Sequence, residues 1–251
     1  MIKLPSDIII DFDSEFESLK KLIVIVFPNF HTYGDNLNTM MNRVILTPKN
    51  EHVDVINNML VKEISGEIFT YFSFDEVIDK TEGFIHKDFL NSLTSNGIPP
   101  HKLVLKRNCP IMLLRNINLS EGLCNGTRLI CREFKRNIIL AEIGIGEYRG
   151  KQVFLPRILF IPLEGDKYSV PFKRNQFLIR PCFVMTINKA QGQTLDFVGL
   201  YLPEPVFSHG QLYVPLSRAR TRKNIKVLIK SHNCCTKNVV YLEILNLIHT
   251  T

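Results

Sequence analysis

The pattern of polar and apolar positions predicts a helix near the start of the chain. From Ser14 onward, apolar side chains recur at the spacing of one helix face until Pro28 ends the pattern. They are Phe16, Leu19, Ile23 and Val26. The acidic cluster around this helix start suits the positive end of a helix dipole better than it suits a metal ion. We therefore interpret residues 1–40 as a helical leader without chemistry of its own.

A short strand and a second helix follow. The run Arg43–Leu46 predicts a buried strand, and Asn50 can cap a helix that begins after a short polar turn. The inward stripe of that helix consists of Val53, Ile56, Met59, Leu60 and Ile64. A strand that runs through a short polar loop into a helix is half of a βαβ unit.

Residues 65–101 show no clear periodicity, and glycines and prolines interrupt them, so we expect irregular structure there. Within this region, Tyr71–Asp75 is an aromatic patch. Two interpretations are open for it. The rings could stack on nucleic-acid bases, or they could pack into a hydrophobic core, which is the interpretation we favour.

Between about 102 and 180 the pattern changes to short strands of high β-propensity separated by turns. The predicted strands are 102–106, 111–115, 127–132, 137–143, 152–155, 158–161 and 168–172. The section 126–172 has the right size for a small antiparallel barrel inserted into a larger domain. Basic residues in and beside it either face phosphate or keep an exposed surface soluble: Arg132, Lys135, Arg136, Lys173 and Arg174.

The last part of the chain is organised around a polar loop between two apolar runs. The run Cys182–Met185 leads into a loop with lysine, glutamine, glycine and threonine, and a second apolar run follows at 197–202. Strand, polar loop and further apolar chain form the usual layout of a ligand site in an open α/β sheet. A predicted short helix at 208–220 then leads to a strand at 224–229.

Composition and charge narrow the class of protein. Of the 251 residues, 45% are hydrophobic and 22% are charged, which is ordinary for a globular protein. The formal charge of +7 is a weak indication of a polyanionic partner such as nucleic acid. The apolar runs are too short to span a bilayer and the start lacks a signal peptide, so we expect no membrane span and no secretion. The six cysteines form no zinc pattern, and we expect free thiols and no metal site.

Two blocks together carry a specific resemblance. They are Met-Thr-Ile-Asn-Lys-Ala-Gln-Gly-Gln-Thr-Leu at 185–195 and Gln-Leu-Tyr-Val-Pro-Leu-Ser-Arg at 211–218. They resemble motifs V and VI of superfamily-one helicases, in the form of the petite-integration-frequency (PIF) family and its Helitron-transposon relatives. Further family phrases match at 45–50, 110–116, 122–128 and 202–210, so that the resemblance covers roughly residues 40–230.

The resemblance implies an α/β fold, namely a RecA-like (P-loop NTPase-like) second helicase domain with an inserted small SH3-like antiparallel β-barrel. On this basis we assign 41–125 and 173–251 to the RecA-like domain and 126–172 to the barrel. Residues 1–40 would then link to a first motor domain that is missing from this sequence. Family members are ATP-driven DNA helicases that move 5′ to 3′ on single strands, with ATP and Mg²⁺ held between two motor domains.

The resemblance also implies three residues of a nucleotide cleft. Arg218 matches the family's arginine finger, a permanently charged fork that can stabilise a γ-phosphate in the transition state. By itself Arg218 would be an ordinary surface arginine, and its place in motif VI reverses that interpretation. Gln191 and Gly192 match the loop that lines the cleft, where glycine allows close backbone approach.

Three further residues match positions of the DNA path. By resemblance, Thr186, Asn188 and Lys189 touch the DNA backbone or relay the nucleotide state to it. Contacts of this kind carry no sequence information. For Lys189, contact with phosphate is favoured over simple solvation.

Two features depart from the family pattern. The sequence holds no Gly-x-x-x-x-Gly-Lys-Ser/Thr loop and no apolar strand that ends in an Asp-Glu pair. We therefore expect ATP and Mg²⁺ to bind only together with the missing first motor domain. Pro215 stands where the family carries a small helix former. In a helix over 211–220 it would remove one backbone hydrogen bond and cost on the order of 3 kcal/mol.

Two functions are compatible with the sequence. The first is a portion of a 5′-to-3′ ATP-dependent DNA helicase that is inactive alone. The alternative is a non-enzymatic, single-strand DNA-binding remnant of a transposon-derived helicase. Under both, we expect single-stranded DNA as a partner and a monomeric chain. The family resemblance implies the nucleus or the mitochondrion, and associates such proteins with DNA repair, recombination and telomere maintenance.

Overall fold

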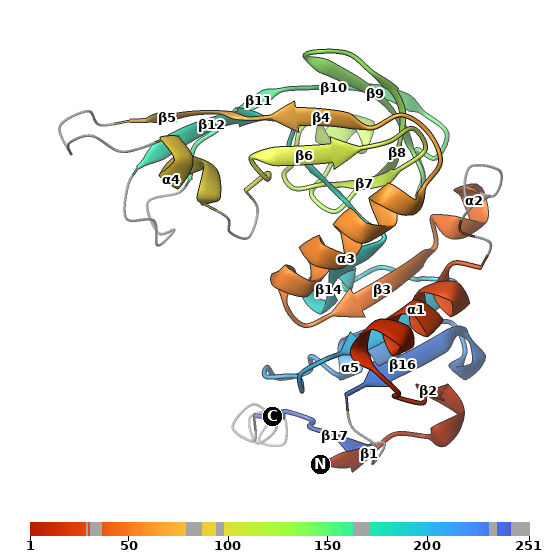
Figure 1. The fold of residues 1–251 in the computed structure, drawn as a ribbon. Coiled ribbons are helices and arrows are strands. Elements are labelled where there is room, and N and C mark those ends of the chain that lie inside the picture. The colour runs from red at the N-terminus through yellow and green to blue at the C-terminus, as the bar shows by residue number, and fades with distance from the viewer. Residues whose placement is uncertain are drawn as a thin grey trace, which may run out of the picture. The chain divides into compact units, whose positions relative to one another are not determined.

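The computed structural model describes residues 1–28, 30, 37–78, 87–93, 98–162, 171–230 and 235–241 (Figure 1). The chain forms two compact units. The first comprises Met1–Asn57 and Phe183–Thr251, and the second comprises Asn58–Cys182. One boundary between them falls inside helix α3 (Asn50–Glu63).

The first unit is built on a five-stranded sheet in the order β14-β3-β15-β16-β2, and every pair in it is parallel. The strands are β2 (Ile9–Ile10), β3 (Arg43–Thr47), β14 (Val184–Thr186), β15 (Phe197–Leu202) and β16 (Ile225–Ile229). Their central residues are apolar and buried, as parallel strands with both faces covered require. The strands predicted at 43–46 and 224–229 are confirmed.

Helix α1 (Glu15–Val26) packs against β3, β15 and β16. Ser14 caps it, because its hydroxyl oxygen accepts the Glu17 N–H at 3.3 Å. Gly199 in β15 makes room for the helix, since a Cβ at that position would lie 2.6 Å from Cγ2 of Val26. The predicted apolar stripe is wrong at Phe16, which is 64% exposed.

Residues 1–40 therefore differ from the predicted leader. Strand β2 pairs with β16 at the edge of the sheet, and α1 buries Leu22, Ile23 and Val26. Shorter elements complete the unit: β1 (Ile2–Lys3) paired with β17 (Cys235–Thr236), α2 (Leu37–Met40), and single 3₁₀ turns at Ser6–Ile8 and Arg222–Asn224. The segment is integral to the unit because it supplies both a strand and a covering helix.

Helix α3 begins three residues after β3, as the polar turn predicted. Its predicted inward residues are buried except Met59, which is half-buried. The buried Asn57 attaches the helix to β14. Its amide donates to the Val184 carbonyl at 2.8 Å and accepts the Val184 N–H at 3.0 Å. These two bonds satisfy backbone groups that the edge strand would otherwise leave unpaired.

The second unit consists of antiparallel strands in three sheets, with the orders β10-β9-β8-β7-β13, β11-β12-β5 and β4-β6. The strands are β4 (Phe69–Phe72), β5 (Phe74–Val77), β6 (Lys102–Leu105), β7 (Pro110–Leu113), β8 (Arg128–Phe134), β9 (Ile138–Ile143), β10 (Gln152–Pro156), β11 (Ile158–Phe160), β12 (Phe172–Gln176) and β13 (Ile179–Pro181). The remaining elements are α4 (Lys87–Ser92) and a 3₁₀ turn at Leu119–Glu121.

The strand predictions between 102 and 161 are confirmed to within one or two residues at most ends. The strand predicted at 168–172 falls mainly outside the described residues, and β12 begins at Phe172. The prediction of irregular structure at 65–101 is wrong, because β4, β5 and α4 lie there. The unit is also wider than the predicted insert at 126–172, because β7 and β13 pair with its largest sheet.

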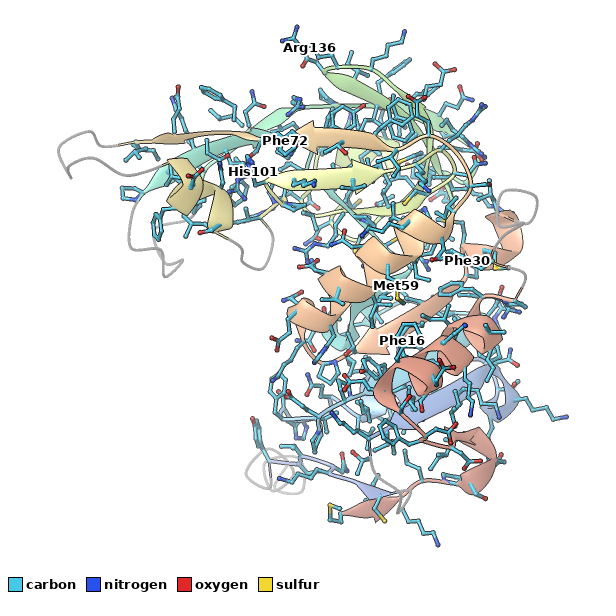
Figure 2. The ribbon with its side chains drawn as sticks, in the orientation of Figure 1. Phe16, Phe30, Met59, Phe72, His101 and Arg136 are labelled. Carbon is cyan, nitrogen blue, oxygen red and sulfur yellow. The ribbon has the colours of Figure 1, made fainter. Side chains whose placement is uncertain are left out.

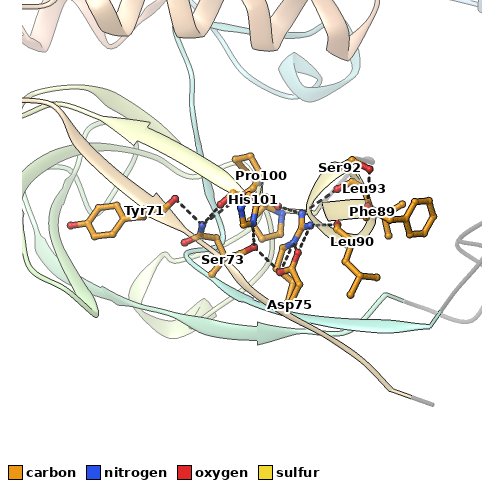
Figure 3. Close-up of polar contacts among 12 residues, drawn as sticks. Tyr71, Ser73, Asp75, Phe89, Leu90, Ser92, Leu93, Pro100 and His101 are labelled. Atoms are coloured by element: carbon orange, nitrogen blue, oxygen red, sulfur yellow. Dashed lines mark hydrogen bonds and ion pairs between the residues drawn. The ribbon is translucent and has the colours of Figure 1, made fainter. Parts of the chain in front are cut away.

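An ion pair is buried in the second unit. Arg174 of β12 donates from Nε and Nη2 to the Asp75 carboxylate at 3.0 and 2.7 Å, and both side chains are almost fully buried. Its other bonds go to the carbonyls of Leu90, Leu93 and Pro99 at 2.8, 3.1 and 2.9 Å (Figure 3). One side chain therefore joins β12 to β5, to α4 and to the chain before β6. A role for Arg174 in facing phosphate is excluded by this burial.

A serine and a histidine extend this network. The Ser73 hydroxyl donates to Asp75 Oδ1 at 2.6 Å and lies 2.7 Å from Nδ1 of His101 (Figure 3). Because the serine proton points to the carboxylate, Nδ1 of His101 is the donor in the second contact. Burial lowers the pKa of His101 below its ordinary value; the Asp75 charge opposes this shift and the Arg174 charge adds to it.

We expect the chain to lose stability as the pH falls below about 6.5, the ordinary pKa of histidine in an unfolded chain. The pKa of His101 is lower in the folded state, so protons bind preferentially to the unfolded state. The stability that neutral His101 contributes is fully present above its pKa in the unfolded chain, and it is lost as the pH falls through its pKa in the folded chain. Thermal unfolding between pH 8 and 5 should show a weaker pH dependence in H101Q than in the native chain. H209Q serves as the control, and an H101Q profile that matches the native one would contradict the prediction.

Candidate functional site

The two motif blocks lie side by side in the first unit. The block 185–195 runs from β14 through the 3₁₀ helix η4 (Ile187–Ala190) toward β15, and the block 211–218 contains helix α5 (Tyr213–Leu216). The Leu195 N–H donates to the Arg218 carbonyl at 3.0 Å, and Leu195 forms a parallel bridge with Ala219. Helix α5 also contacts η4. Tertiary structure thus brings together the blocks that the sequence singled out.

The guanidinium of Arg218 is anchored to this loop. Nη1 donates to the Gln193 carbonyl at 3.2 Å, and Nε donates to the Val214 carbonyl at 3.2 Å. Nη2 donates to the Ser217 hydroxyl at 3.0 Å. The side chain is half-buried, so it combines a fixed position with access to solvent. A fixed cation of this kind can meet a phosphate.

Gln191 and Gly192 form the exposed tip of the same loop. Gly192 has a φ of +80°, which is the left-handed region that favours glycine. Among the described residues, its two chain neighbours aside, a Cβ at Gly192 would meet no atom within 4 Å. The backbone conformation therefore explains this glycine, without any crowding inside the unit.

The three residues predicted for the DNA path lie at and just after the end of β14. Thr186 closes that strand, in register with Thr47 at the end of β3. Asn188 is exposed and Lys189 is half-buried, both in η4. This is the carboxyl edge of the parallel sheet, where ligands bind in open α/β sheets.

Three polar residues at the same edge received no role from the sequence. The buried Thr47 hydroxyl has no hydrogen-bond partner within the described ranges. Lys49 forms an ion pair with Glu204, which follows β15, and its hydrogen bond lowers the pKa of Glu204. Thr47 and Lys49 lie within the sequence block 45–50 that resembles the family, so this block could have identified them as candidates. Nothing in the sequence shows that Glu204 meets Lys49, because the pairing of β15 with β3 decides it.

Gln211 of the second block has a structural role. It is buried, and its Oε1 accepts the N–H of Phe207 at 2.9 Å and that of Ser208 at 3.3 Å. These bonds shape the turn that leads into α5.

Pro215 does not interrupt a long helix. Helix α5 spans four residues, fewer than the short helix predicted within 208–220, and Pro215 is its third residue. The N–H groups of a first helical turn have no partner within the helix, so a missing one costs little. The predicted cost of about 3 kcal/mol is wrong because the helix is too short to need that bond.

The basic residues beside the antiparallel strands are mostly engaged in ion pairs. Arg132 pairs with Glu142 at 2.8 Å, and Lys173 pairs with Glu76 at 2.6 Å. Lys135 and Arg136 are exposed in the turn between β8 and β9. Of the basic residues for which a phosphate contact was considered, Lys135 and Arg136 remain candidates.

Across the part of the chain that the structure describes, no group of three or more His, Cys, Asp or Glu side chains has the arrangement of a metal site. The cysteines there, namely Cys109, Cys124, Cys131, Cys182 and Cys235, are free thiols. No described helix has the length and apolar character needed to cross a membrane.

The parallel sheet with polar loops at its carboxyl edge, interrupted in sequence by a unit of antiparallel strands, has the RecA-like fold of the solved Pif1 helicases that it matches. Residues 88–134 match the family model described as "DNA helicase Pif1, 2B domain". The chain is 30% identical to the rat ATP-dependent DNA helicase PIF1 over 189 residues, which is 71% of this chain and 26% of that protein. The chain belongs to the Pif1 helicase family.

Other relatives agree with this. The Pif1 helicase of Bdellovibrio bacteriovorus is 28% identical over 191 residues, covering 71% of this chain and 42% of that protein. Pif1 from Candida albicans matches with a TM-score of 0.62 at 19% identity, over 96% of this chain and 55% of that one. Bacteroides Pif1 bound to single-stranded DNA matches with a TM-score of 0.60, over 92% and 53%. The chain thus spans about a quarter of the length of the rat relative and about half of the solved ones.

We expect P215A to leave the chain as stable as the native protein or to destabilise it by about 1–2 kcal/mol, because the buried proline ring is lost. If the proline were strained, the same substitution would stabilise the chain by up to about 3 kcal/mol. Chemical denaturation measures the difference. N58P, at an exposed position inside α3, is the control for a proline that does break a helix and should cost about 3 kcal/mol.

Proposed function

We propose that this chain supplies part of a 5′-to-3′ ATP-dependent DNA helicase, namely one wall of a nucleotide cleft and part of a single-strand DNA path. The observation that carries the proposal is the anchoring of Arg218 to the loop at 187–195. This contact links a cation suited to phosphate with the edge of the sheet that is suited to a nucleic-acid backbone. A shift in that loop would therefore move the cation as well.

In the nucleotide cleft, Arg218 acts as the arginine finger and Gln191 and Gly192 line the wall. ATP and Mg²⁺ are held mainly by a first motor domain, which contributes the phosphate-binding loop that this sequence lacks. The curated relatives are named ATP-dependent DNA helicases, and a solved Bacteroides Pif1 was in complex with ADP-AlF3 and single-stranded DNA. These names support the assignment of nucleotide and DNA as ligands.

On the DNA path, Thr186, Asn188 and Lys189 contact the phosphate backbone, and Thr47 and Lys49 extend the contact along the same edge. In this proposal the second unit corresponds to the family's SH3-like barrel, and the protein works as a monomer in the nucleus or the mitochondrion.

We expect the 251-residue chain alone to hydrolyse no ATP, with or without single-stranded DNA. Catalysis of phosphoryl transfer depends on positioning by groups on both sides of the phosphates, and Arg218 is on one side only. Steady-state turnover measures this, with R218A as the matched variant. Turnover that R218A abolishes would reveal a complete site and contradict the proposal.

We expect the chain to bind single-stranded DNA with an affinity that falls steeply with salt, by about 0.7 in the log–log slope for each phosphate contact. K189A should reduce that slope by about one contact, equally for different base sequences. Fluorescence anisotropy over a salt series measures both values. K20A, an exposed lysine on α1, is the control. Binding that ignores salt, or an equal effect of K20A, would refute a phosphate contact at Lys189.

A further inference from the structure

The segment 71–76 in the second unit alternates between the two faces of its sheets. On one face, Tyr71 is buried, and Ser73 and Asp75 join the network around Arg174. On the other face, Phe72 and Phe74 are 56% and 59% exposed. The expectation that the aromatic patch packs into a core is confirmed for Tyr71 and wrong for both phenylalanines.

This arrangement reverses the usual preference of a strand. In β5, a shift by one residue against β12 would bury the Phe74 ring and expose the Asp75 carboxylate, which is the normal outcome for such side chains. The buried Arg174 prevents that shift, because it binds Asp75 through two of its nitrogens. An ion pair held inside while two rings stay outside indicates that the rings are used at the surface.

Phe74 lies in a row across three strands. It pairs with Asn175 of β12, which pairs with Leu159 of β11, and Leu159 is 55% exposed. The ring of Phe72 is 5.6 Å from the ring of His101 and tilted against it (Figure 2). The row therefore carries exposed apolar side chains on its two outer strands with Asn175 between them, and the hydrogen-bonded network around Arg174 lies on the other face of β5.

Two exposed cations, Lys135 and Arg136, lie in a turn that Arg157 connects to Phe72. Arg157 donates from Nη1 to the Phe72 carbonyl at 2.9 Å and from Nε to the Arg136 carbonyl at 3.4 Å. The Arg157 guanidinium itself packs over the rings of Tyr71 and Phe177, at 5.5 and 5.0 Å from their centroids, so it faces the buried side. The carboxylate on the same strand face as the rings, Glu76, is neutralised by Lys173.

We propose that Phe72 and Phe74, bordered by Lys135 and Arg136, form a stacking platform for unpaired nucleic-acid bases. Exposed rings offer a face to any base, while the neighbouring cations meet the phosphates, so such a platform tolerates different sequences. The excess of cations favours a polyanion over a protein surface. The platform lies wholly in the second unit and uses none of the groups of the motor-domain site.

The test compares the full native chain with F72A/F74A by fluorescence anisotropy on a labelled oligothymidine. We expect the double variant to bind at least about tenfold more weakly, since stacking of one base contributes that much or more. F16A removes an equally exposed ring from the first unit and should bind as the native chain does. Thermal unfolding of each variant checks that the fold is kept, because both rings lie outside the core.

Two further comparisons separate stacking from other causes. An oligonucleotide with abasic sites should bind the native chain more weakly but should cost F72A/F74A little more. F72L/F74L keeps the apolar surface without the rings and should bind as weakly as the alanine variant. Native affinity in either double variant would overturn the platform. Self-association of the native chain that F72A/F74A abolishes would also overturn it, and would assign the face to a protein contact.

This proposal and the DNA path of the first unit can fail separately. Loss of the salt-dependent contact in K189A, with no effect of F72A/F74A, would leave the DNA path and remove the platform. Weaker binding by F72A/F74A, with no effect of K189A, would support the platform and remove the DNA path. F72A/F74A should leave the salt slope unchanged, since it removes no charge.

Discussion

Arg174 carries a full positive charge in the interior of the second unit, and its surroundings are arranged to compensate for it. A buried charge is costly unless it is paired and hydrogen-bonded, and here one carboxylate and three main-chain carbonyls meet the guanidinium. These bonds fix the strand that carries Asp75 in one register. The same register presents Phe74 to solvent, so the interior charge determines which side of β5 faces outward.

The first unit depends on pairing between segments that are distant in sequence. The bond from the Leu195 N–H to the Arg218 carbonyl holds the two motif blocks together, and the Arg218 side chain then reaches the Gln193 carbonyl. Below them, Asn57 joins α3 to the edge strand β14. The Arg218 cation, a polar loop and the carboxyl edge of a sheet are in this way parts of one connected body.

The corrections share a physical origin in tertiary pairing. The region 65–101 has no repeating apolar pattern because β5 buries a polar group, the Asp75 carboxylate, whose charge Arg174 compensates. The first forty residues resemble a solvated leader because α1 buries one narrow face against Gly199. In the sequence, Pro215 resembles a helix breaker. The structure shows that it breaks no long helix, because α5 ends at Leu216.

The sequence by itself determined the family and most strands, because these follow from local hydrophobic periodicity and from motifs that are contiguous in the chain. It also identified Arg218 and the loop at 186–192 as candidates. Only the tertiary structure decided that Arg218 is anchored to Gln193, that Lys49 meets Glu204, and that Phe72 and Phe74 face solvent. Each of these facts depends on which strands pair and in which register, and a local pattern cannot specify a partner that lies far along the chain.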